Sequence, residues 1–245
     1  MKLGHVAQIN IGVSDLQTSL AFYERLGYEK IEVSADPYPW ARITDGQNLI
    51  MLNGDGNRYL GLVYFSLDTT RRVAKLEQKG IEIIQRREKD GQLMMAVFVG
   101  PGHLVVGLIT FDPEEIPRPS GRPLTSGGTF GEFALSVADY HAAVKFWSKL
   151  GFATIHESDD PYPWGIVSDE NIILGLHQNR EIGDEVDFKY PAMTYYAPDM
   201  VKRIERLKNE GFSFNYESIS ESGVVNNATL LGPDGESFFF FEGEI

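Results

Sequence analysis

The five-residue segment DPYPW occurs twice, the second copy starting 160 − 36 = 124 positions after the first. In each copy the first proline precedes a tyrosine and the second precedes a tryptophan. The aromatic residues are Tyr38 and Trp40 in the first copy, and Tyr162 and Trp164 in the second. Tryptophan faces attract cations and stack on planar rings, so these aromatic pairs favour binding of a flat or cationic small molecule. Alternatively, they only fill gaps between structural units, and a duplication copied them without any ligand.

The side chains available for metal or nucleophile chemistry are few. The 245-residue chain has no cysteine and five histidines. Disulfides and thiolate metal sites are therefore excluded, and a metal would need histidine, aspartate or glutamate ligands. No glycine-rich phosphate loop follows a strand, and no serine nucleophile elbow is present.

Charge and hydropathy restrict the partners. The formal net charge is −13, from 22 Lys+Arg against 35 Asp+Glu, and no basic run is present. This balance lacks the electrostatic signature of nucleic-acid binding and modestly favours cationic ligands. No apolar run approaches the length of about 18 residues that spans a bilayer, and the N-terminal residues do not form a signal peptide. We expect a soluble, cytoplasmic protein with a small-molecule ligand, and neither nucleic acid nor membrane as a partner.

A fourfold repeat must position the aromatic pairs. The offset of 124 also relates Asp45 to Asp169, which indicates a tandem duplication. Within each half, an aspartate followed by an amphipathic stretch and a glycine twelve positions later recurs. The four copies are Asp15–Gly27, Asp68–Gly80, Asp139–Gly151 and Asp199–Gly211.

Each repeat has the pattern of one helix among four strands. Aspartate is a favourable helix N-cap and glycine closes helices, so the spacing predicts a three-turn helix. Leu16, Leu20 and Tyr23 form its apolar stripe in the first repeat. An alternating strand pattern precedes each helix, and three strand-like runs follow it, clearest at residues 212–219, 224–231 and 237–242. Each unit is therefore predicted to be βαβββ.

A linker separates the halves. Residues 112–131 read DPEEIPRPSGRPLTSGGTFG, where crowded Pro, Gly and Ser sustain neither helix nor sheet. We therefore predict a first domain at residues 1–111, a linker at 112–130 and a second domain at 131–245. Four units in one chain are compatible with a monomer or a homodimer.

Four βαβββ units, Asp-capped helices ending in LGY or LGF, and a GPDG hairpin before the last strand resemble the glyoxalase, bleomycin-resistance and extradiol-dioxygenase (vicinal oxygen chelate) superfamily. The resemblance covers nearly the whole chain. It implies an α+β fold with two cup-shaped domains, each a mixed sheet from two units with helices packed outside. It also implies a divalent metal inside a cup. Whether the cups form within or between the halves stays open.

The superfamily's metal-ligand positions carry mostly unsuitable side chains here. They correspond to Gln8 and Glu132, Met51 and Gly175, Leu62 and Met193, and Val106 and Phe239. His177 is the one histidine that strand alternation directs toward the same interior as Glu132. Two ligands fall short of the three or more that a stable site generally needs. We therefore expect no metal cofactor, and a divalent metal is disfavoured.

If the metal-ligand positions face the inside of a cup, alternation along each strand identifies the other side chains that face inward. Together with the tyrosines of the two DPYPW segments, these side chains form a predicted ligand-binding lining. It comprises Gln8, Asn10, Tyr38, Trp40, Arg42, Asn53, Tyr64, Glu132, Tyr162, Trp164, His177, Tyr195 and Phe239.

Three functional hypotheses follow. The first is a metal-independent module that holds an aromatic or cationic ligand in a cup lined by aromatic residues. The second is a glyoxalase-like or dioxygenase-like enzyme, with an atypical metal site or with Glu132 and His177 as metal-free acid and base. The third is a structural protein whose cups are filled.

Overall fold

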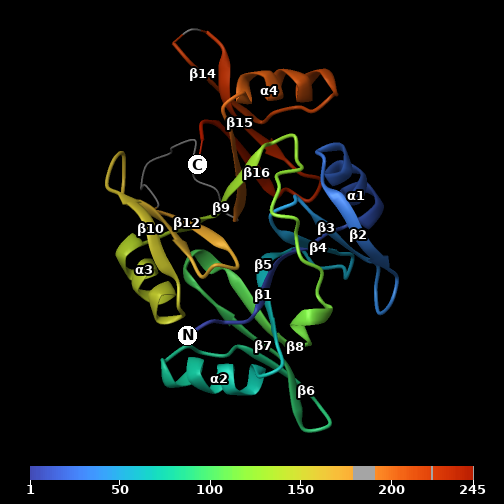
Figure 1. Ribbon diagram of the computed structural model, residues 1–245, viewed down its shortest axis with the longest axis vertical. Helices are drawn as coiled ribbons and strands as arrows, with labels where there is room; N and C mark the ends of the chain where they lie inside the picture. Colours follow the sequence, from blue (N-terminus) through green and yellow to red (C-terminus); the bar gives the residue numbers. More distant parts are fainter. Residues whose placement is uncertain (179–190, 222, 245) are drawn as a thin grey trace. The chain divides into compact units, whose positions relative to one another are not determined.

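The computed structural model describes residues 1–178, 191–221 and 223–244 (Figure 1). In this part of the chain the backbone forms two eight-stranded mixed sheets and four α-helices, which confirms the predicted α+β class. One helix and then three strands follow each opening strand, four times over, so the predicted βαβββ plan is also confirmed. The predicted strand at residues 212–219 is shorter and begins at Tyr216.

Each sheet comes from one half of the sequence. The first sheet has the order β2-β3-β4-β1-β5-β8-β7-β6. Its strands are β1 (Val6–Gly12), β2 (Glu29–Ser34), β3 (Trp40–Thr44), β4 (Leu49–Asn53), β5 (Leu60–Ser66), β6 (Gln85–Lys89), β7 (Gln92–Val99) and β8 (Val105–Thr110).

The second sheet repeats that order as β10-β11-β12-β9-β13-β16-β15-β14. Its strands are β9 (Thr129–Val137), β10 (Ala153–Ser158), β11 (Trp164–Ser168), β12 (Ile173–Gln178), β13 (Ala192–Ala197), β14 (Tyr216–Ile219), β15 (Val225–Leu231) and β16 (Ser237–Glu242). In both sheets the first and last strands of the second βαβββ unit pair in parallel. These pairs are β5 with β8 and β13 with β16.

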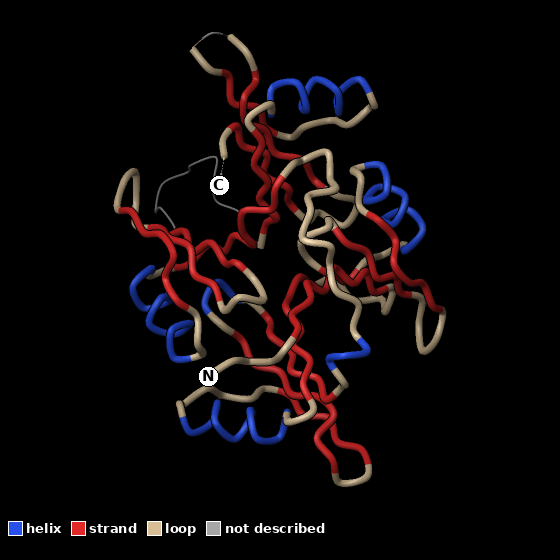
Figure 2. Tube along the Cα trace, in the orientation of Figure 1, coloured by secondary structure: helices blue, strands red, loops and turns tan. Residues whose placement is uncertain are grey.

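The helices lie on the sheets through their apolar stripes. They are α1 (Leu16–Arg25), α2 (Thr69–Gln78), α3 (Tyr140–Lys149) and α4 (Met200–Asn209). Figure 2 shows each helix lying against strands of its own repeat, as α2 does on β7 and α4 on β15. The predicted stripe of α1 is buried, with Tyr23 fully enclosed. Two short 3₁₀ helices, Pro101–His103 and Pro113–Glu115, flank β8.

The aspartates that precede the helices act in two ways. Asp15 and Asp139 accept hydrogen bonds from the backbone N–H groups of Thr18 (2.7 Å) and Ala142 (2.9 Å), as predicted for N-caps. Asp68 and Asp199 instead bind the arginine four residues later, each at 2.6 Å. The capping prediction is therefore wrong for α2 and α4, because an arginine competes for the carboxylate. The closing glycines all have positive φ, between 77° and 99°.

The chain divides into two compact units that each combine material from both halves. Unit 1 consists of Met1–Asn10, Leu60–Arg118 and the described part of Ala134–Lys189. Unit 2 consists of Ile11–Tyr59, Pro119–Phe133 and the described part of Tyr190–Ile245. The residues that make up these units differ from those of the predicted domains at 1–111 and 131–245. In the described residues, no helix is long and apolar enough to cross a membrane.

Candidate functional site

The two DPYPW segments share one local structure. Trp40 Nε1 donates to the carbonyl oxygen of Asp36 at 3.1 Å, and Trp164 Nε1 donates to that of Asp160 at 3.2 Å. Both Asp–Pro peptide bonds are cis. Each indole therefore closes the turn that precedes its own strand, which gives both tryptophans a structural role whether or not a ligand binds.

In unit 1, Trp164 and His177 form a stacked aromatic pair. They face each other across β11 and β12, their ring planes differ by 1°, and the ring centroids are 5.7 Å apart. The Tyr162 hydroxyl lies 3.3 Å from His177 Nδ1. All three side chains are half-buried, and the exposed His156 ring lies 4.9 Å from Trp164. The predicted Tyr162, Trp164 and His177 are therefore together, and we call them the unit 1 aromatic site.

The equivalent position in unit 2 has different chemistry. Trp40 pairs across β3 and β4 with Asn53, the counterpart of His177. The Arg42 guanidinium lies 5.7 Å from the Trp40 ring centroid and 2.8 Å from Glu32. Burial lowers the pKa of Arg42 and Glu32 opposes that shift, yet a guanidinium stays protonated in proteins. The cation beside Trp40 therefore disfavours a cationic ligand there.

The other predicted lining residues are distributed over both units. Unit 1 also holds Gln8, Asn10 and Tyr64, and unit 2 also holds Tyr38, Glu132, Tyr195 and Phe239. Gln8 Nε2 donates to Asn10 Oδ1 at 2.8 Å. Glu132 is buried in unit 2, with 3% of its surface exposed, and His177 belongs to unit 1. Their proposed pairing as acid and base stays a prediction.

Tyr195 is a core residue, and it does not share a face of the sheet with Phe239, although their common place in the predicted lining requires it. In the parallel pair of β13 and β16, Tyr195 is opposite Phe240, and Phe239 is opposite Thr194. Tyr195 and Phe239 therefore lie on opposite faces of the sheet. The alternation within a strand is readable from sequence, but the register between two strands can slip by one residue, which exchanges the faces.

Tyr64 has the corresponding place in unit 1. It is 1% exposed, and burial raises its pKa well above the usual value, with a further contribution from the nearby Asp169 carboxylate. Tyr64 and Tyr195 are thus too enclosed to contact a ligand in the structure as it stands.

The donor set does not fit the divalent metal that the resemblance implies. Throughout the described ranges, no three His, Cys, Asp or Glu side chains converge on a point where they could hold an ion. Glu132 is the single carboxylate among the matched positions, which are otherwise occupied by amide or apolar residues. Metal independence stays a prediction.

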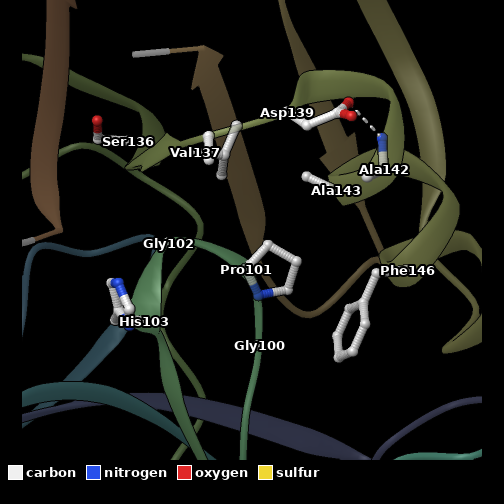
Figure 3. Close-up of a pocket in the computed structure, with 11 residues that line it drawn as sticks. Gly100, Pro101, Gly102, His103, Ser136, Val137, Asp139, Ala142, Ala143 and Phe146 are labelled. Carbon is white, nitrogen blue, oxygen red and sulfur yellow. Dashed lines mark hydrogen bonds between the residues drawn. The ribbon is translucent and has the colours of Figure 1, made fainter.

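One hollow in the structure was not predicted from the sequence. A hollow of about 490 Å³ in unit 1 lies between the turn at residues 100–103 and the start of α3 (Figure 3). The signal that could have revealed it is the difference between GPGH in this turn and GPDG in its counterpart at residues 232–235.

Comparison with known proteins gives a match in structure alone. No family model matches the chain, and no curated protein matches it in sequence. Solved structures match over its whole length. Homoprotocatechuate 2,3-dioxygenase from Arthrobacter globiformis aligns with a TM-score of 0.64 at 12% identity, covering 100% of this chain and 81% of that one.

Two further structures agree. A catechol 2,3-dioxygenase aligns with a TM-score of 0.59 at 14% identity, covering 100% of this chain and 89% of that one. The 2,3-dioxygenase LapB from Pseudomonas sp. KL28 aligns with a TM-score of 0.58 at 14% identity, covering 99% and 92%. Identities this low establish the fold and leave the activity open. The chain therefore shares its overall fold with these 2,3-dioxygenases.

Proposed function

We propose that the protein binds a small aromatic or cationic molecule without a metal, and that the unit 1 aromatic site holds it. The observation that carries this proposal is the parallel, half-buried stack of Trp164 and His177 with the Tyr162 hydroxyl beside it. Half-buried rings combine a rigid apolar face with polar groups at the edge, as ligand sites commonly do.

The ligand class follows from the charges around the ring. Unit 1 has Ile166 where unit 2 has Arg42, so no guanidinium lies over Trp164 in the equivalent place. The net charge of −13 also raises the local concentration of cations. A planar ligand, neutral or positively charged, is therefore favoured at Trp164 over an anionic one.

Tryptophan fluorescence tests this proposal. The chain has three tryptophans, so Trp40→Phe leaves Trp164 as the reporter nearest the site, and Trp164→Phe leaves Trp40. A screen of planar aromatic amines, quaternary ammonium compounds and aromatic acids should give saturable quenching in Trp40→Phe that is lost in Trp164→Phe. Equal quenching in both variants, or none with any compound, would contradict the proposal.

A matched pair of variants tests the role of the histidine. His177→Ala removes one ring of the stack and should weaken binding about 2- to 10-fold, the range expected for one aromatic contact. Asn53→Ala changes the equivalent position in unit 2 and should leave the affinity unchanged. If both variants weaken binding equally, the unit 1 aromatic site is not the ligand site.

The second candidate is an enzyme, which is favoured by the fold shared with solved 2,3-dioxygenases. It would require either a metal held by side chains other than the matched ones or acid–base catalysis by Glu132 and His177. Retention of stoichiometric metal is the measurement that separates metal-free binding from the metal-dependent form of the enzyme.

A further inference from the structure

Two turns in equivalent places close in the same way but carry different side chains. The backbone N–H of Gly100 donates to the Leu104 carbonyl, and that of Gly232 donates to the Glu236 carbonyl, both at 2.8 Å. Gly102 lies two positions after the donor glycine of the unit 1 turn, and Asp234 lies two positions after that of the unit 2 turn, so the two residues are equivalent in sequence position. The next residue of unit 1, His103, has a φ of 57° where unit 2 has a glycine.

In unit 2, the Asp234 side chain fills the space in front of α1. Its Oδ1 accepts from the Ser14 N–H at 2.8 Å and from Ser14 Oγ at 2.6 Å, and its Oδ2 accepts from Ser19 Oγ at 2.9 Å. The side chain is only 3% exposed. This carboxylate and its two serines therefore form a closed polar plug.

In unit 1, every part of the plug has been replaced by a residue without a polar side chain. Gly102 stands for Asp234, Ala138 for Ser14 and Ala143 for Ser19. The space that remains is the hollow of about 490 Å³. Figure 3 shows the turn with Pro101 on one side of it and the start of α3 with Ala143 on the other.

The walls of the hollow are mainly apolar, and the polar groups are few. Pro101, Val137, Ala143 and Phe146 contribute apolar surface, while His103, Ser136 and Asp139 supply the polar side chains. One Asp139 oxygen accepts from the Ala142 N–H, and an ionised carboxylate can accept further hydrogen bonds.

The turn cannot easily fill the hollow with a side chain of its own. Gly102 has a φ of 69°, and a Cβ atom there would lie 2.9 Å from the Ser136 carbonyl oxygen. A side chain at this position would therefore require the backbone to shift.

We propose that this hollow, which we call the turn cavity, is a second ligand site for a compact, neutral, mainly apolar aromatic molecule carrying one hydrogen-bond donor. Its volume lies within the range of about 300–1,000 Å³ typical of small-molecule pockets. The apolar walls favour an uncharged ring, because burying a charge there is unfavourable, and the Asp139 carboxylate provides the acceptor for the donor. This site is separate from the unit 1 aromatic site and does not depend on the function proposed for it.

The probe is indole, a neutral bicyclic ring with one N–H donor, and 1-methylindole is the matched compound without the donor. Amide chemical shifts of ¹⁵N-labelled full-length protein are followed during titration with each compound. Indole should produce saturable shifts at residues 100–104 and 136–146, and 1-methylindole should bind about 10- to 150-fold more weakly, the usual effect of one lost hydrogen bond to a charged group. Equal binding of the two compounds would overturn the assignment of a donor-carrying ligand.

Two variants reduce the size of the turn cavity. Ala142→Leu projects a larger side chain from an exposed position on α3 and should weaken indole binding at least tenfold, whereas Ala21→Leu at an exposed position on α1 should have no effect. The triple variant G102D/A138S/A143S introduces the three side chains of the unit 2 plug, and its aspartate requires the turn backbone to shift. If it folds, it should abolish the shifts at residues 100–104.

Three further outcomes would overturn the proposal. They are the absence of saturable shifts at the cavity up to millimolar indole, an unchanged indole affinity in Ala142→Leu, and indole shifts confined to the unit 1 aromatic site. Trp164→Ala distinguishes the two sites, because it should remove binding at the aromatic site while indole binding in the turn cavity persists.

Discussion

The Tyr195 hydroxyl donates a hydrogen bond to Asp45 Oδ2 at 2.9 Å, although the two residues are 150 positions apart and almost fully buried. The Tyr28 hydroxyl lies 2.5 Å from the Tyr195 oxygen. Because Tyr195 gives its only proton to Asp45, Tyr28 must be the donor in this second bond. The chain of three polar groups joins the first and the last βαβββ repeats inside the core of unit 2.

Loss of the Tyr195 hydroxyl should destabilise the protein. Tyr195→Phe removes one donor from Asp45 and leaves the Tyr28 hydroxyl without its acceptor, at a cost of about 1–3 kcal/mol for a buried polar group left unpaired. Urea denaturation followed by circular dichroism measures the change. Tyr38→Phe, at an exposed tyrosine, should change the free energy of unfolding by less than about 0.5 kcal/mol. Equal values for the two variants would show that the buried chain of hydroxyls contributes no net stability.

The polar plug of unit 2 should be as sensitive. Asp234→Ala removes the acceptor for Ser14 and Ser19, and hydrogen bonds to a charged group contribute about 1.5–3 kcal/mol. We expect a loss of about 2–3 kcal/mol in the free energy of unfolding and faster amide hydrogen exchange in the first turn of α1. Asp159→Ala, at an exposed aspartate, is the control. Unchanged exchange in α1 would show that the plug does not hold the start of this helix.

Glu236 should make the stability depend on pH. Burial raises its pKa in the folded protein above the value of about 4.3 expected in the unfolded chain. As the pH rises through about 4.3, the unfolded chain therefore releases its proton first, and the free energy of unfolding falls until the pH passes the folded-state pKa. Asp45, whose pKa burial also raises, contributes with the same sign.

The Glu236→Gln variant isolates this contribution. It removes the titrating group, so its stability should fall less steeply above pH 4 than that of the unchanged protein. Urea denaturation at intervals between pH 4 and pH 8 gives both slopes, and Glu205→Gln on the exposed face of α4 is the control. Parallel profiles for the unchanged protein and Glu236→Gln would mean that Glu236 has the same pKa in the folded and unfolded states.

Purified protein should retain little metal. We expect well under one equivalent of Ni²⁺, Zn²⁺, Mn²⁺ or Fe²⁺ per chain after incubation with each ion and desalting, because the matched positions lack a three-ligand donor set. Elemental analysis measures this directly. A retained equivalent that is lost in Glu132→Ala or His177→Ala would contradict metal-free binding and favour the enzyme.

The repeat plan was predictable because it rests on local chemistry. Asp15 and Gly27 mark the ends of α1 through capping and a positive φ, which depend on residues close by in the sequence. The pairing of Trp164 with His177 was also accessible, because one short hairpin connects their strands and the alternation within each strand sets the face.

Features that depend on distant segments were not predictable. The face of Tyr195 depends on the register between β13 and β16, which are separated by α4 and two strands. The turn cavity arises from side chains that are missing at Gly102, Ala138 and Ala143, and an apolar small residue gives no sign of whether its surroundings close over it. The grouping of repeats into units likewise depends on contacts such as that between Tyr195 and Asp45.

The composition of the two units has a consequence for cleavage of the backbone. A cut between Arg118 and Pro119 would leave each fragment with segments of both units and with neither unit whole. Each fragment would then lack the residues that complete its buried polar groups, as Asp45 would lack Tyr195. The two fragments should consequently be unable to fold independently. They should recover native structure only when mixed, because each fragment supplies segments that the other needs to complete both units.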